Sequence, residues 1–133
     1  MRSLRRQPLL MVAVLIATLR AASAGDSFPF GTDLMLDVAP MRGSKRVPIL
    51  QIDENGNASI DLWCSSLKGQ AVVGDDTIAI TMGPFEPAPC TTERQAADDA
   101  LLAQLGQVTH WRVDGEVVEL SGGATLRFRR MTN

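Results

Sequence analysis

The chain has 133 residues, of which 45% are hydrophobic, and its 13 Lys and Arg stand against 15 Asp and Glu for a formal net charge of −2. This length accommodates one domain with one modest hydrophobic core. The charge balance excludes the strongly basic surface that is typical of nucleic-acid-binding proteins.

The N-terminus has the three parts of a secretory signal peptide. Residues 1–8 carry three arginines and no acid, an apolar run follows over 9–19, and Ala22-Ser23-Ala24 fits the small-x-small cleavage rule. We therefore expect cleavage near Ala24 and a periplasmic or secreted protein. An uncleaved anchor is the alternative, but the apolar run is too short for a bilayer of about 30 Å. A pair of adjacent arginines leaves the choice between general secretory and twin-arginine export open.

Cleavage would leave a short lead-in over residues 25–32 and a single domain over 33–133. Four arginines would be removed, so that nine Lys and Arg face fifteen Asp and Glu and the net charge becomes −6. This acidity argues against nucleic acid or an anionic membrane surface as a partner, and no transmembrane segment is expected after cleavage. The arginines near the C-terminus are interpreted as a solvated strand face; they are Arg127, Arg129 and Arg130.

The first part of the domain alternates apolar and polar residues with the period of two that is typical of half-buried strands. Asn55-Gly56 predicts a tight hairpin turn. In the strand after this turn, Cys64 is in phase with Ile60 and Leu62, and "SSLKG" is expected to break the pattern. Pro48 indicates an edge position or a bulge. The predicted strands cover residues 34–38, 46–52, 59–64, 70–73 and 77–82.

One helix is predicted, after a proline-rich connector. Thr92 and Gln95 fit a capping box, in which the two side chains satisfy first-turn donors reciprocally. Arg94 and Asp98 are spaced to pair across one turn, and Gly106 is placed to end the helix. A narrow apolar stripe would face the core; its residues are Ala97, Leu101, Leu105 and Val108. Three strands follow over 108–113, 116–120 and 124–130, the first two joined by a turn at Asp114-Gly115.

Few residues are candidates for chemistry. His110 is the one histidine and has no cysteine or carboxylate at ligand spacing, so no metal site and no cofactor are expected. Acid pairs occur at Asp53-Glu54, Asp75-Asp76 and Asp98-Asp99. The first two are expected in solvated turns and the third on the polar side of the helix, where nothing would tune a carboxyl for acid-base catalysis. We expect no catalytic residues.

Cys64 and Cys90 allow two interpretations. In an oxidising compartment they are expected to form a structural disulfide that closes the loop of residues 64–90. The alternative is a free Cys90 thiol, acidified at the start of the helix and active as a nucleophile or redox sensor. The disulfide is favoured because a thiol enzyme needs a nearby base, and the one histidine is predicted on a distant strand.

The order of these features resembles the META domain family of HslJ-like heat-shock and envelope proteins. The resemblance covers roughly residues 33–130 and rests on "WCSSLKGQ", on "PCTTERQAADDALLAQLGQVTHWRVDGEVVEL" and on "ATLRFRR". The chain resembles a divergent member, because Trp63-Cys64-Ser65 stands where the family usually has Gly-Cys-Asn. The resemblance implies an α+β fold, a small curved antiparallel β-sheet or partly open β-barrel with one helix packed against it.

The resemblance implies little chemistry, so the function is expected from the compartment and the absence of a catalytic motif. We expect an exported, non-enzymatic envelope protein, a binding or stress-response module whose partner is an unidentified envelope protein, peptide or lipid. Two alternatives stay open. One is a periplasmic inhibitor of a cell-wall hydrolase, for which an acidic domain would suit a basic lytic enzyme. The other is a thiol-based redox protein that uses Cys90.

Overall fold

The computed structural model describes residues 27–84 and 88–132. The predicted signal peptide over residues 1–24, with its cleavage site after Ala24, lies outside them. Among the described residues there is one helix, α1 (Thr92–Leu105), and no helix long and apolar enough to cross a membrane. The strands are β1 (Leu34–Leu36), β2 (Ile49–Ile52), β3 (Asn57–Asp61), β4 (Ser66–Val73), β5 (Ile78–Met82), β6 (His110–Asp114), β7 (Val117–Gly122) and β8 (Ala124–Arg130).

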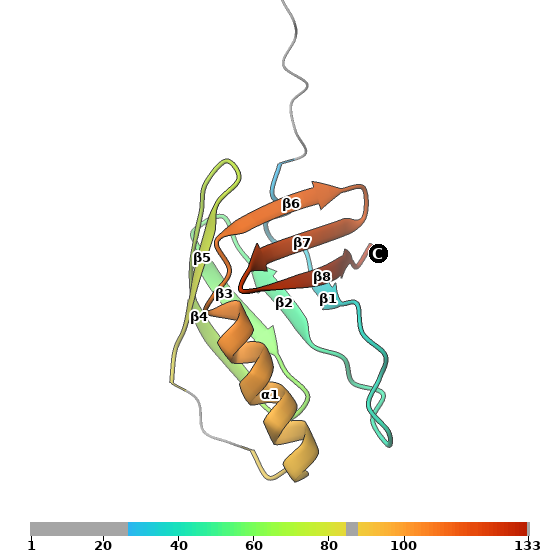
Figure 1. Cartoon of the computed structure of the whole chain (residues 1–133). Helices are drawn as coiled ribbons and strands as arrows, with labels where there is room; N and C mark the ends of the chain where they lie inside the picture. Colours follow the sequence, from blue (N-terminus) through green and yellow to red (C-terminus); the bar gives the residue numbers. More distant parts are fainter. Residues whose placement is uncertain (1–26, 85–87, 133) are drawn as a thin grey trace, which may run out of the picture.

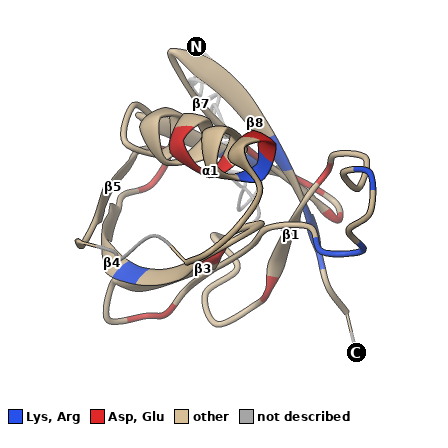
Figure 2. Ribbon diagram, turned by 90° about the horizontal axis from the view of Figure 1, so that it is seen from below, with Lys and Arg blue, Asp and Glu red and all other residues tan. Residues whose placement is uncertain are grey.

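The eight strands form one antiparallel sheet in the order β5-β4-β3-β2-β1-β8-β7-β6. The sheet curls until its two outer strands meet. Thr77 forms a β-bridge with His110, and the N–H of Ile78 donates to the carbonyl of Thr109 at 3.0 Å. The result is a nearly closed barrel, with α1 against one end (Figures 1 and 2). The predicted α+β fold is confirmed.

Inward-facing residues of every strand meet in one core. Leu34 pairs with Leu50 across β1 and β2, and Leu36 pairs with Phe128 across β1 and β8. On β8 the alternation has the predicted phase, with Phe128 fully buried and the arginine on either side of it at least partly exposed. Burial of each such large apolar side chain contributes about 1.5–3 kcal/mol, so this shared interior holds the curled sheet together.

Glycine-containing turns close the hairpins at the positions that the sequence predicts. Gly56 has φ +83°, and a Cβ atom built on it would lie 2.5 Å from the carbonyl oxygen of Ala71. Only glycine avoids both the backbone strain and this collision. Pro48 precedes β2 instead of lying inside it, and its carbonyl accepts the N–H of Leu36 at 2.9 Å.

The expected break at residues 65–69 is wrong. β4 begins at Ser66, and Ser66 to Gln70 pair with β3. The inward positions of β4 are Leu67, Gly69 and Ala71, and glycine in the middle position hides the alternation in the sequence. A side chain there would collide, because a Cβ atom on Gly69 would lie 2.3 Å from the carbonyl oxygen of Thr81.

The prediction that Cys64 lies on a strand is wrong. β3 ends at Asp61, and residues 62–65 form a turn closed by the N–H of Leu62 donating to the carbonyl of Ser65 at 2.7 Å. Leu62 is fully buried and continues the apolar phase of β3. The pattern therefore extends past the last ladder pair, although the chain has already left the sheet.

The helix begins one residue earlier than the predicted capping box requires. Thr91 is the N-cap, with an extended backbone, and its hydroxyl accepts the N–H of Arg94 at 3.3 Å. Thr92 is the first helical residue. The side chain of Gln95 donates to the carbonyl of Ala88 at 3.5 Å, so it contacts the connector instead of closing a capping box. Two adjacent threonines make the choice of cap ambiguous in the sequence.

The cap assignment predicts a difference between the two threonines. Thr91→Ala should lower the free energy of unfolding by about 1 kcal/mol, because a first-turn donor loses its acceptor. Thr92→Ala, the matched control, should change it by less than about 0.5 kcal/mol, since an exposed position in a helix tolerates alanine. Thermal unfolding followed by circular dichroism measures both. A larger loss for Thr92→Ala would contradict the assignment.

Candidate functional site

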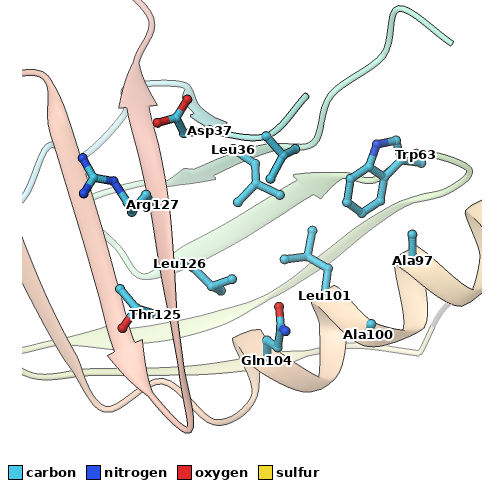
Figure 3. A pocket seen from close by; sticks show the side chains of 11 residues that line it. Leu36, Asp37, Trp63, Ala97, Ala100, Leu101, Gln104, Thr125, Leu126 and Arg127 are labelled. Carbon is cyan, nitrogen blue, oxygen red and sulfur yellow. The ribbon is translucent and has the colours of Figure 1, made fainter. Parts of the chain in front are cut away.

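An apolar groove lies beside α1. It has a volume of about 340 Å³ and lies between α1, β8, the end of β1 and the turn that carries Trp63 (Figure 3). This size is at the lower end of the range, about 300–1,000 Å³, that small-molecule pockets occupy. Its apolar walls include Leu36, Trp63, Ala97, Leu101 and Leu126.

The helix shapes this groove with small side chains. Leu101 and Leu105 are buried and anchor α1 on the barrel, in agreement with the predicted stripe. Ala97 and Ala100 lie along the groove, where their single methyl groups leave the space between helix and β8 open (Figure 3). The groove is thus a consequence of alanine at two helical positions that larger residues would fill.

Asp98 fixes the opposite wall. Its carboxylate accepts the backbone N–H of Trp63 at 2.8 Å on Oδ1 and that of Cys64 at 3.1 Å on Oδ2. The residue is only 2% exposed, so its predicted place on the polar side of the helix is wrong, as is its predicted pairing with Arg94. The carboxylate faces the turn of residues 62–65, whose backbone donors it satisfies. A buried charge needs such partners, and the two N–H groups supply them.

The disulfide lies next to the same turn. Cys64 and Cys90 are bonded, with a Cα–Cα distance of 5.9 Å. Cys90 directly precedes the N-cap Thr91, so the bond ties the start of α1 to the turn that carries Trp63. In this form the Cys90 sulfur is held in a covalent bond and is no nucleophile.

Trp63 has an unsatisfied polar atom. Its indole Nε1 is buried and has no hydrogen-bond partner among the described residues. A second hollow, of about 510 Å³ near the start of β6, contains Trp111, whose Nε1 already donates to the carbonyl of Gly74 at 2.9 Å. Of the two tryptophans, Trp63 is therefore the one whose indole N–H has no acceptor among the described residues.

Charged residues line the rim of the groove. Arg127 and Asp37 both border it. Arg127 pairs with Glu119 at 3.2 Å, and Arg129 pairs with Asp37 at 3.3 Å, so the outer face of β8 is a solvated, ion-paired surface, as predicted. Arg130 differs, because it is only partly exposed and its Nε has no partner in the described part of the chain.

The other candidate residues lie apart from the groove. His110 is exposed at the start of β6, with Nδ1 2.9 Å from the hydroxyl of Thr109. Asp53 accepts hydrogen bonds from Asn57 and from Asn55, and chiefly the Asn57 side-chain amide holds the pKa of this carboxyl below its usual value. Asp75-Asp76 is exposed in the β4–β5 turn. Over residues 27–84 and 88–132, no group of three metal-ligating side chains comes together.

The sequence of the barrel and its helix matches a known domain family. Residues 34–133 match the META domain family, a range that includes every element of the groove. The chain belongs to the META domain family. The predicted resemblance is confirmed, and among curated proteins no match is found.

Solved structures share the fold of this META domain. A protein from Burkholderia xenovorans is 21% identical with a TM-score of 0.63, over 78% of this chain and 84% of that one. A DUF4847 family protein from Bacteroides vulgatus is 15% identical with a TM-score of 0.52, over 62% of this chain and 57% of that one. A third structure, determined by NMR, is 13% identical with a TM-score of 0.59, over 74% and 87%. At these identities the likeness shows the fold alone.

Proposed function

We propose that this META domain is an exported, non-catalytic binding module of the cell envelope, and that the groove beside α1 is its ligand site. The observation that carries the proposal is the groove itself, an apolar hollow of about 340 Å³ whose wall includes Trp63 together with leucine and alanine side chains. A concave, mostly apolar surface with a few polar groups is the usual form of a binding site.

The structural roles of three candidate side chains support a non-catalytic function. Asp98 holds the Trp63–Cys64 turn, Asp53 holds the β2–β3 turn, and Cys90 is in a disulfide. Each of these candidate side chains has a structural task. Export is supported by the sequence of residues 1–24 and by the disulfide, because such bonds form and persist in oxidising compartments.

The walls indicate an apolar group as the part of the ligand that enters. Leu36, Leu101 and Leu126 offer only methyl groups, and burial of each CH₂ of a ligand contributes about 0.8 kcal/mol. A ligand that covers the walls with several such groups would therefore be held by apolar contacts alone. Such binding involves no covalent intermediate and no proton transfer.

Two other functions compete with this proposal. The inhibitor of a cell-wall hydrolase rests on the acidity and the architecture of the domain, and a lytic assay with and without the purified protein decides it. The thiol-based redox protein needs a free Cys90, and the bond to Cys64 is the observation against it.

Two alanines of α1 provide a test of the groove. Ala100 borders the groove and Ala103 is exposed on α1 outside its lining, so Ala100→Leu fills the groove whereas Ala103→Leu is a matched control. We expect Ala100→Leu to weaken binding of the neutral apolar dye N-phenyl-1-naphthylamine about tenfold, equivalent to about 1.4 kcal/mol, and Ala103→Leu to leave it unchanged. A fluorescence titration measures this. Equal effects of the two variants, or no dye binding by the unmodified protein, would overturn the proposal.

A further inference from the structure

We propose that the groove binds a single-chain phospholipid, a lysophospholipid, with its alkyl chain between α1 and β8 and its phosphate over the basic loop that joins β1 to β2. This inference rests on the proposed function of the groove as the ligand site. It adds the chemical class of the ligand.

The backbone around the groove favours an alkyl chain over a peptide. β8 is paired on both sides, with β7 and with β1, and the N–H of Asp37 donates to the carbonyl of Arg127 at 2.8 Å. No unpaired strand edge therefore lines the groove among the described residues, and a peptide could not add itself to the sheet there. An alkyl chain needs no hydrogen-bond partners, and a groove of about 340 Å³ favours one chain over the two of a diacyl lipid.

The apolar lining continues into a basic loop. Val38 borders the groove and is 44% exposed, so an alkyl chain in the groove could cover its methyl groups. Val38 lies near the start of the loop of residues 37–48, in which Arg42, Lys45 and Arg46 are exposed. Most of the basic ribbon lies on this side of the molecule, around β1, β8 and the loop, whereas Lys68 lies away from it on β4 (Figure 2).

The start of α1 adds a fourth cation. A Cβ atom built on Gly43 of the loop would lie 3.7 Å from Nη2 of Arg94, so the guanidinium of this helical residue lies against the loop. The same end of the helix is where the N-cap Thr91 and the disulfide hold α1 in place. The basic loop thus passes close to the start of α1, and the following turns of this helix line the groove.

Ion pairing leaves an excess of positive charge there. The cations with partners are Arg46, 4.0 Å from Asp61, and the two β8 arginines that pair with Glu119 and Asp37. Arg42, Lys45 and Arg94 form no ion pair with a described residue, and Glu93 is the one acid in the first turn of α1. The loop that includes Val38 at the border of the groove thus carries cations that no described acid pairs with. Two arginines suit the bidentate recognition of a phosphate better than that of an uncharged sugar head.

The test compares three amphiphiles with the same twelve-carbon chain, each below its micelle concentration. They are dodecyl phosphate, dodecanoate and the uncharged dodecyl maltoside. The chain has two tryptophans, so Trp111→Phe leaves Trp63 as the single fluorescent reporter in the groove wall. Circular dichroism first checks that this variant is folded. Binding is followed by the change in Trp63 emission.

We expect dodecyl phosphate to bind about tenfold more tightly than dodecyl maltoside, with dodecanoate between them, and the advantage to fall as salt is added. In the reporter background, Arg42→Gln with Lys45→Gln should remove most of this advantage and leave maltoside binding unchanged. Lys68→Gln is the matched control and should change neither. Ala100→Leu should weaken all three, because it fills the shared alkyl site.

The outcomes separate the two proposals. Equal affinity for the phosphate and the maltoside, with both lost in Ala100→Leu, would overturn the phosphate assignment and keep the groove as a binding site. Tighter binding of dodecanoate than of dodecyl phosphate would also overturn the phosphate assignment. Binding of none of the three would overturn both proposals.

Discussion

Replacing Cys64 and Cys90 together by alanine is expected to lower the free energy of unfolding by about 3.5 kcal/mol. The bond joins residues 26 positions apart, and loop-closure entropy in the unfolded chain gives about this value for a loop of that size. In a small domain, whose total stability is about 5–15 kcal/mol, this is a large share. Urea denaturation of the variant and of the unmodified protein measures the difference.

Reduction supplies the control for this experiment. The unmodified protein in excess dithiothreitol should unfold at the same urea concentration as the double variant, because both lack the cross-link. Without reductant, intact-mass analysis after alkylation should show no added label on the native protein. A loss below about 1 kcal/mol, or alkylation of Cys90 without reductant, would contradict the structural role of the bond and favour the thiol interpretation.

Asp98→Ala is expected to lower the free energy of unfolding by about 3 kcal/mol. The substitution removes two hydrogen bonds to a buried carboxylate and leaves the backbone N–H groups of Trp63 and Cys64 without an acceptor. Asp98→Asn should cost less, because the amide oxygen can still accept one of the two. Urea denaturation at neutral pH provides the measurement.

The neighbouring residue is the matched control for Asp98. Asp99 is exposed on the same helix, so Asp99→Ala should change stability by less than about 0.5 kcal/mol. Combined with the double cysteine variant, Asp98→Ala should cost a different amount than it does alone, because both act on the turn of residues 62–65. Equal losses for Asp98→Ala and Asp99→Ala would show that the buried hydrogen bonds do not stabilise the turn.

Local chemistry explains which parts of the fold were predictable. The turns at Asn55-Gly56 and Asp114-Gly115 were predictable because glycine alone accepts the positive φ that they need, and the structure has φ +83° and +60° there. The alternation on β8 was visible because apolar and charged residues share its two faces. The predicted start of β4 was too late, because Gly69 takes an inward position where an apolar residue would have marked the strand. Glycine is needed there because β5 lies too close for a side chain, which the sequence does not show.

The candidate site was much less predictable. The sequence placed Asp98 on the solvated side of the helix, and nothing near it in the chain indicates its partners, which lie 34 and 35 residues away. Trp63 lies on the predicted strand 59–64 out of phase with Ile60, Leu62 and Cys64, so the sequence indicates that it faces outward. The groove depends on the packing of Ala97 and Ala100 beside β8. Small residues on a helix do not indicate a groove until the element that packs opposite them is known.

The sequence by itself therefore determined most strands but not all of their ends, the late helix, the family and the pair of cysteines, because periodicity, turn residues and composition act over a few positions along the chain. Only the tertiary structure decided that the two outer strands meet at Thr77 and His110, that Asp98 holds the Trp63 turn, and that an apolar groove is left open beside β8. These features arise from contacts between segments far apart in the chain, and no local pattern encodes which segments will meet.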